Sequence, residues 1–247
     1  MKRTVISFLA AFALLLALTA VTAQKKDKPW TDWSKKDAEQ MLSDSPWAQT
    51  QTDTDTSQMF YSPTTDPRMT GVRNNSTTDT RLGQGATNQA VSIKFRVRFF
   101  SARPIRQALV RLMAIQQKPT PEAAQKMTNF AEMQPKDSII VTVIFESTDQ
   151  RSAASVMQAF NSAVTGTLKN NTYLERSDGK HLFLEEYVPP GKDGFGARFI
   201  FLRYPDEQPF VTANTAEVRF YAQFSNELKI DRRFKVADML YQGALEY

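Results

Sequence analysis

Residues 91–112 read VSIKFRVRFFSARPIRQALVRL and decide the fold, because two periodicities meet within them. Residues 91–99 alternate strictly between apolar and polar side chains, as in a strand with one buried face. Pro104 then opens a segment with apolar residues at helical spacing as far as Leu112. Proline suits the first turn of a helix because it has no N–H to leave unpaired there. The stretch therefore predicts a strand followed directly by a helix.

Beyond residue 112 the same two patterns recur without regular alternation. We expect helices over residues 120–131 and 152–168. Residues 138–147 (SIIVTVIFES) predict a central strand buried on both faces. Shorter strand-like runs follow between Gly, Pro and Asn/Asp clusters, at residues 171–176, 181–188, 197–204, 216–224 and 228–236. Because helices and strands cluster, residues 90–247 predict an α+β domain with a mostly antiparallel sheet and about three helices.

A short helix and a polar segment precede this domain, over residues 24–89. Ser34 is expected to cap the helix, and Ser45-Pro46 to end it. Residues 48–90 are rich in Thr, Gln, Asn and Asp and bury little apolar surface. We expect a short strand near 48–61 and a flexible loop to about residue 89; a wholly disordered linker is the alternative.

The three tryptophans of the chain lie close to the expected short helix: Trp30 and Trp33 precede it, and Trp47 follows it. A sugar platform or a membrane-interface anchor is one interpretation, because indole combines apolar area with a hydrogen-bond donor. The other is that they dock the helix onto the domain. We favour docking, because so short a helix is marginal without tertiary contacts.

The first residues predict export. Met1-Lys2-Arg3 is a positive n-region, residues 8–18 form an apolar core, and Val21-Thr22-Ala23 has small residues where a signal peptidase requires them. Residues 1–23 are thus expected to be a signal peptide, with an uncleaved membrane anchor as the alternative. The chain has no cysteine, which excludes disulfides and a lipid-anchored cysteine. We expect a bacterial protein of the periplasm or the cell exterior, with no membrane span after cleavage.

Several chemistries are argued against. His181 is the only histidine, so metal sites with several histidine ligands are excluded. Serine–histidine catalysis would need His181, and no G-x-S-x-G motif accompanies it. No cofactor is expected. A calcium loop beginning at Asp53 fails because Gln58 and Thr64 stand where Gly and Glu are needed. Glu185 and Glu186 are adjacent on an expected strand, so they point to opposite faces and cannot flank one glycosidic bond.

Basic residues of the chain cluster in one stretch, although the net charge of the whole chain is small. Its formal net charge is only +5, yet no acidic residue occurs between Asp79 and Glu122. The basic residues of this block predict a contact surface for an anionic envelope component or an acidic protein, because arginine grips phosphate and carboxylate with two donors. They are Lys94, Arg96, Arg98, Arg103, Arg106 and Arg111.

Pairing within the fold is the alternative, and we favour it because charge runs are usually solvated or internally paired. The expected partners are acids of later strands, which would lie across the sheet from the basic residues. These are Glu185, Glu186, Glu217 and Asp231.

Residues 29–56 (PWTDWSKKDAEQMLSDSPWAQTQTDTDT) and 238–247 (DMLYQGALEY) resemble segments of hypothetical secreted proteins of soil bacteria, of the acidobacterial type. The resemblance implies export and supplies no activity, cofactor or catalytic residue.

The sequence thus predicts an exported, envelope-associated binding or structural module that is not an enzyme. Its ligand and its oligomeric state are left open, and nucleic acid is not an expected partner. The alternative is a hydrolase that acts on an envelope or extracellular polymer through carboxylates, with Glu185 or Glu186 as candidates.

Overall fold

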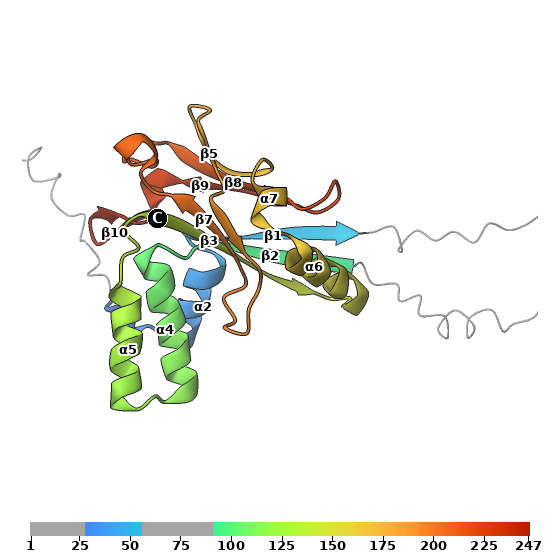
Figure 1. The fold of residues 1–247 in the computed structure, drawn as a ribbon. Helices are drawn as coiled ribbons and strands as arrows, with labels where there is room; N and C mark the ends of the chain where they lie inside the picture. Colours follow the sequence, from blue (N-terminus) through green and yellow to red (C-terminus); the bar gives the residue numbers. More distant parts are fainter. Residues whose placement is uncertain (1–27, 56–90) are drawn as a thin grey trace, which may run out of the picture.

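The protein is described here by a computed structural model that covers residues 28–55 and 91–247 (Figure 1). Its main strands form two antiparallel sheets, with the orders β1-β2-β3-β7-β6 and β5-β4-β8-β9. The bounds are β1 Ala48–Asp55, β2 Val91–Phe99, β3 Ser138–Ser147, β4 Thr172–Arg176, β5 His181–Phe183, β6 Glu186–Val188, β7 Ala197–Leu202, β8 Glu217–Gln223, β9 Lys229–Lys235, and a small hairpin of β10 Leu240–Tyr241 and β11 Ala244–Leu245.

The helices gather beside the larger sheet, so the predicted α+β class with mostly antiparallel strands is confirmed. Helices α2, α4 and α5 lie together at one end of the molecule, and α6 lies at the other (Figure 1). Their bounds are α2 Lys35–Ser43, α4 Arg103–Gln117, α5 Pro121–Glu132, α6 Gln150–Ser162 and α7 Thr165–Leu168, with 3-10 turns at Trp30–Asp32, Pro205–Glu207 and Val236–Asp238.

The core lies between the two sheets. Phe95, Val97 and Phe99 of β2 point inward, as the alternation predicts, and Phe99 meets Phe234 of β9 with ring centroids 4.8 Å apart. Phe199 of β7 meets Phe220 of β8 in the same way, at 5.1 Å. Strand β3 is central, as predicted, but Ile140 on its outer face is only partly buried. The chain therefore forms a two-sheet sandwich whose outer faces point in opposite directions.

Two expected elements are each divided. The run 181–188 forms β5 in one sheet and β6 in the other, and the fully buried Leu184 marks the crossing. The main-chain N–H of Leu184 donates to Thr172, and that of Glu185 donates to Ile200, so the two residues bond to different sheets. The expected helix 152–168 ends at Ser162, and α7 follows after two extended residues.

Gln51 of β1 joins the two sheets where their edge strands β1 and β9 meet. Its carboxamide donates to the carbonyl of Lys229 and accepts from the N–H of Asp231, both at 2.8 Å. The side chain thereby imitates a peptide group of a neighbouring strand and satisfies the edge of β9. Gln49 donates in a similar way to the carbonyl of Arg233.

The N-terminal helix is part of the same fold. Ser34 caps α2 as expected, in a reciprocal pair of hydrogen bonds with Asp37. Trp33 and Trp47 are buried in the core, which confirms the docking interpretation, and β1 pairs with β2 along its whole length. Three expectations fall outside the described residues: the signal peptide of residues 1–23, residues 56–61 of the expected strand, and the flexible loop to residue 89.

Candidate binding surface

The three basic residues of β2 share the outer face of the larger sheet but differ in environment. Lys94 is exposed. Arg96 makes two parallel hydrogen bonds with Glu146 of β3, at 2.6 and 2.8 Å. Arg98 is only 7% exposed, and its Nε donates to the carbonyl of Leu42 at the end of α2, at 2.6 Å. Burial lowers the pKa of Arg98 to about 10.

The arginines of α4 make their polar contacts within the fold. Arg106 is fully buried, its pKa is lowered by burial to about 10, and it donates to the carbonyls of Phe100 and Ser101. The main-chain N–H of Arg103 donates to the carboxylate of the buried Glu246, whose Oε1 lies 3.2 Å from the Arg103 Nε. Arg111 donates to the carbonyl of Trp33, at 2.6 Å. The structure therefore does not bring the six basic residues together on one solvent-facing surface.

The acids expected to pair with this block lie elsewhere. Glu217 pairs with Arg233, and Asp231 pairs with Arg219, on the outer face of the smaller sheet. The apolar core separates that face from the basic side chains of β2. Glu186 lies on β6, at the far edge of the larger sheet from β2.

The two glutamates of the hydrolase interpretation are both exposed. Glu185 stands at the crossing between the sheets, and Glu186 begins β6. Neither lines the apolar groove beside α6 or the hollow beside α7. Within residues 28–55 and 91–247, no group of three or more His, Cys, Asp or Glu side chains is placed to hold a metal ion.

The outer face of the smaller sheet instead carries a row of aromatic side chains. Phe183, Tyr173 and Tyr221 are register partners on β5, β4 and β8, so they lie side by side across three strands. The rings of Tyr173 and Tyr221 stack, with centroids 5.1 Å apart and planes at 26°, and Phe183 is 47% exposed. His181, two residues before Phe183 on β5, packs beside the row, with its ring centroid 4.4 Å from that of Tyr173. We call Phe183, Tyr173 and Tyr221 the aromatic row.

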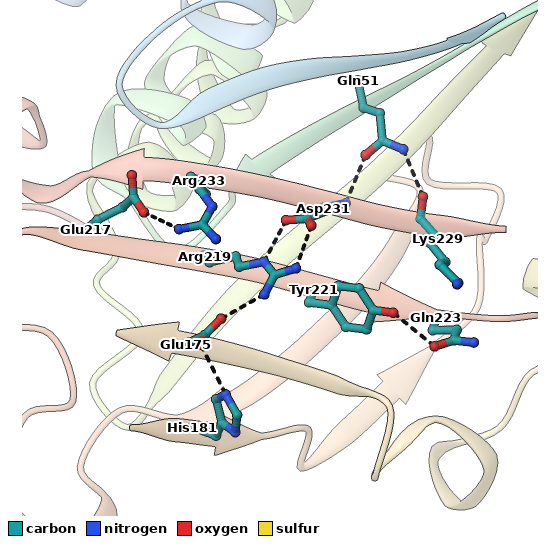
Figure 2. A network of polar contacts seen from close by, with 10 residues as sticks. All are labelled: Gln51, Glu175, His181, Glu217, Arg219, Tyr221, Gln223, Lys229, Asp231 and Arg233. Atoms are coloured by element: carbon teal, nitrogen blue, oxygen red, sulfur yellow. Dashed lines mark hydrogen bonds and ion pairs between the residues drawn. The ribbon is translucent and has the colours of Figure 1, made fainter. Parts of the chain in front are cut away.

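A charged row runs parallel to the aromatic row, two residues along each strand: its register partners on β5, β4, β8 and β9 are His181, Glu175, Arg219 and Arg233, and Asp231 lies opposite Tyr221. Figure 2 shows the contacts that link the charged residues. Arg219 stands at its centre and donates to both oxygens of Asp231, at 2.8 and 2.6 Å, and to Glu175 at 2.9 Å. The Glu175 carboxylate also lies 3.4 Å from Nε2 of His181. The guanidinium of Arg219 lies 5.2 Å from the ring centroid of Tyr221, which couples the two rows.

The charges of this row hold one another in their ionised forms. The hydrogen bonds from Arg219 lower the pKa of Asp231 and that of Glu175, and burial opposes them in both cases. The hydrogen bond to Asp231 raises the pKa of Arg219 in return. Burial raises the pKa of the Tyr173 hydroxyl, so this ring is neutral at physiological pH. The rows therefore form a fixed surface of uncharged rings beside paired charges.

Sequence reasoning missed this surface. Tyr173 with Glu175 on one strand, and Arg219 with Tyr221 on another, have the alternation of a solvent-facing sheet side. That signal indicates which side chains share a face of each strand. It does not give the strand order β5-β4-β8-β9, which alone places the rings in one row.

Comparisons of the chain with protein-family models, with curated proteins and with solved structures find no match. Among the described residues, no helix has both the length and the apolar character needed to cross a membrane.

Proposed function

We propose that this protein is an exported, non-enzymatic binding module, and that it binds a neutral polysaccharide through the aromatic row on the smaller sheet. Export is supported by the signal-peptide pattern of residues 1–23 and by the resemblance to secreted bacterial proteins. Polysaccharides are abundant outside the bacterial cytoplasm, so ligand and compartment agree.

The aromatic row is the observation that carries the proposal. Aromatic side chains usually enter the core, and a solvent-facing group of them commonly marks a binding site. The row offers ring faces and edges across three neighbouring strands, which lie about 4.8 Å apart. The apolar C–H faces of sugar rings pack against such side chains. The adjoining carboxylates and amides can receive and donate hydrogen bonds to sugar hydroxyls.

The paired charges favour an uncharged ligand. A nucleic acid would need arginine or lysine free to neutralise phosphates. Here Arg219 and Arg233 are already paired with carboxylates, and those carboxylates would repel phosphate; the exposed Lys229 and Lys235 stand apart at the two ends of β9. The predicted anionic contact through the block that begins at Lys94 stays a prediction, with Lys94 as its most exposed member.

The experiment is a depletion assay with residues 24–247, which include every described element. The probes are chitin, amorphous cellulose and an insoluble β-glucan, with heparin-agarose, DNA-agarose and anionic vesicles as charged comparators. We expect retention on at least one neutral polysaccharide, little changed by salt because no ion pair with the ligand forms. Phe183→Ala should weaken it about tenfold, the effect of losing one aromatic contact.

Tyr204→Ala is the matched control, because Tyr204 is 50% exposed on a loop away from the aromatic row. Tyr173→Ala provides a second row variant, and its folding is checked by circular dichroism. The proposal fails if no neutral polysaccharide retains the protein, or if Phe183→Ala and Tyr204→Ala bind alike. If the protein instead binds anionic vesicles in a salt-sensitive way, and Lys94→Glu abolishes this binding, the contact surface lies on β2.

A further inference from the structure

A hollow adjoins the end of the aromatic row, between α7, the end of α6 and the turn that links β8 to β9. Its volume is about 480 Å³, within the range of small-ligand sites. The side chains of Gln223, Asn171 and Asn226 line it, together with Phe224 and small residues of α6 and α7. Every residue that lines this hollow is uncharged.

The polar groups of this hollow include unused hydrogen-bonding capacity. Within the described residues, the carboxamides of Asn171 and Asn226 make no hydrogen bond. Gln223 uses only its Oε1, which accepts from the hydroxyl of Tyr221 at 2.9 Å. A carboxamide carries two donors and an acceptor, which suits the neighbouring hydroxyls of a sugar. Phe224 is held by stacking on Phe160, with centroids 4.6 Å apart, and supplies an apolar wall.

The hollow is continuous with the proposed surface. Tyr221 belongs to the aromatic row, Gln223 follows two residues later on the same face of β8, and their hydrogen bond joins the two regions (Figure 2). A polymer that packs on Tyr221 and runs along β8 therefore reaches Gln223 next. No lining side chain of the hollow would attract or repel a charge.

We infer that this hollow is a subsite that receives a neutral sugar unit of the polysaccharide, with Asn171, Gln223 and Asn226 binding its hydroxyls. The inference rests on the proposed function of the aromatic row. It adds that affinity depends on chain length, because only an oligosaccharide that extends beyond Tyr221 reaches the carboxamides. It also makes these three residues determinants of which arrangement of sugar hydroxyls is bound.

The test is calorimetric titration with chito-oligosaccharides and cello-oligosaccharides of increasing length. For the wild type, affinity should rise with length and then level off. Asn171→Ala and Asn226→Ala should each lower the affinity for the longest oligosaccharides by about 3–10-fold, the effect of losing an uncharged hydrogen bond. They should leave the shortest oligosaccharides unaffected. Asn214→Ala, an exposed asparagine at the opposite end of β8, is the matched control and should change nothing.

The outcomes separate the subsite from the proposed function. If Phe183→Ala weakens binding at every length while both asparagine variants bind like the wild type, the subsite is wrong and the proposed function stands. If Phe183→Ala has no effect and no oligosaccharide binds, both fail. Unchanged unfolding midpoints of the variants exclude misfolding as the cause of a loss.

Discussion

Basic residues that look equivalent in the sequence have different physical roles in the fold. Lys94 and Arg98 lie on the same face of one strand, yet Lys94 is exposed and Arg98 is buried against the end of α2. The partner of Arg98 is a main-chain carbonyl, that of Leu42. Any residue offers such a carbonyl, so no pattern of acidic residues could reveal this pairing. The sequence predicted acidic partners on later strands, and the partner of Arg98 is a carbonyl instead.

Replacing Arg98 and Lys94 separately by methionine tests this difference in environment. Arg98→Met keeps the bulk of the side chain but leaves the Leu42 carbonyl without its charged donor, so we expect a loss of about 1–3 kcal/mol in unfolding free energy. Lys94→Met removes an exposed charge and should change that free energy by less than about 0.5 kcal/mol. Urea unfolding measures both. Equal losses would contradict the structural role given to Arg98.

Gly196 is the position where backbone and packing both require glycine. Its φ is +81°, and a Cβ there would lie 2.3 Å from the carbonyl oxygen of Val143. Gly196→Ala should therefore cost about 3 kcal/mol or more, from left-handed strain and overlap together. Gly194→Ala, with φ +76° but open space around it, should cost only about 1 kcal/mol.

Gly166 provides the control for these glycine variants. It lies in α7 with open space around it and no positive φ, so Gly166→Ala should cause no loss of stability. Chemical denaturation of the three alanine variants gives the order. If Gly196→Ala were no worse than Gly194→Ala, the close approach of residue 196 to β3 would be incorrect.

The hydrophobic periodicity predicted well which helices and strands exist, but it predicted poorly how the strands are connected and paired. The strand 91–99, the strand 138–147 and the helix that begins near Pro104 occur as expected, because each buries one continuous face. The run 181–188 was divided between two sheets because the chain crosses the sandwich at Leu184. Local alternation continues through such a crossing, so only the tertiary arrangement reveals it.

The candidate surface also depends on a strand order that the sequence does not give. Phe183 and Tyr221 are far apart in the sequence and join one row only because β4 pairs with both β5 and β8. Alternation implies that Tyr173 and Glu175 share one face of their strand. It could not say that this face is exposed, or that the neighbouring strands would also present rings to solvent.

Helix α2 is short, and hydrogen bonds at its N-terminus help to stabilise it. Ser34 accepts from the N–H of Asp37, and the Asp37 carboxylate accepts from the N–H of Ser34. Ser34→Ala should lower the unfolding free energy of the whole protein by about 1 kcal/mol, because it leaves an N-terminal donor of the helix unpaired.

Ser43→Ala, in the last turn of α2, is the control for the cap variant. Its hydroxyl donates only to the carbonyl of Glu39, which is already within the helix, so stability should hold or rise slightly. Thermal unfolding followed by circular dichroism compares the two. A local loss of helix signal before the main transition would instead mean that α2 unfolds independently of the sandwich.

The whole molecule separates its roles between two outer faces. The outer face of the larger sheet meets α2 through Arg98 and the Leu42 carbonyl, while the smaller sheet presents its paired charges and rings to solvent. The rows are fixed from both sides, because Gln51 holds the edge of β9 and Arg219 links three strands. A surface ordered before binding loses less entropy when a ligand arrives.

The charged row makes part of the stability of the molecule depend on pH. Glu175 and Asp231 have ordinary pKa values of 4.5 and 3.8, and the hydrogen bonds from Arg219 lower both in the folded protein. The folded state therefore binds protons less readily than the unfolded state. The resulting stabilisation is present above about pH 4.5 and is lost as the pH falls through the lowered values.

Arg219→Gln removes the cause of both shifts. At pH 7 we expect it to cost about 1 kcal/mol, since solvent screens these partly exposed pairs. The difference in melting temperature between wild type and variant should narrow as the pH falls below about 4. Arg96→Gln is the control, because its partner Glu146 is 57% exposed and less depends on that pair. A difference for Arg219→Gln that stays constant down to acidic pH would mean that Arg219 stabilises the sandwich by packing on Tyr221 and not through its carboxylates.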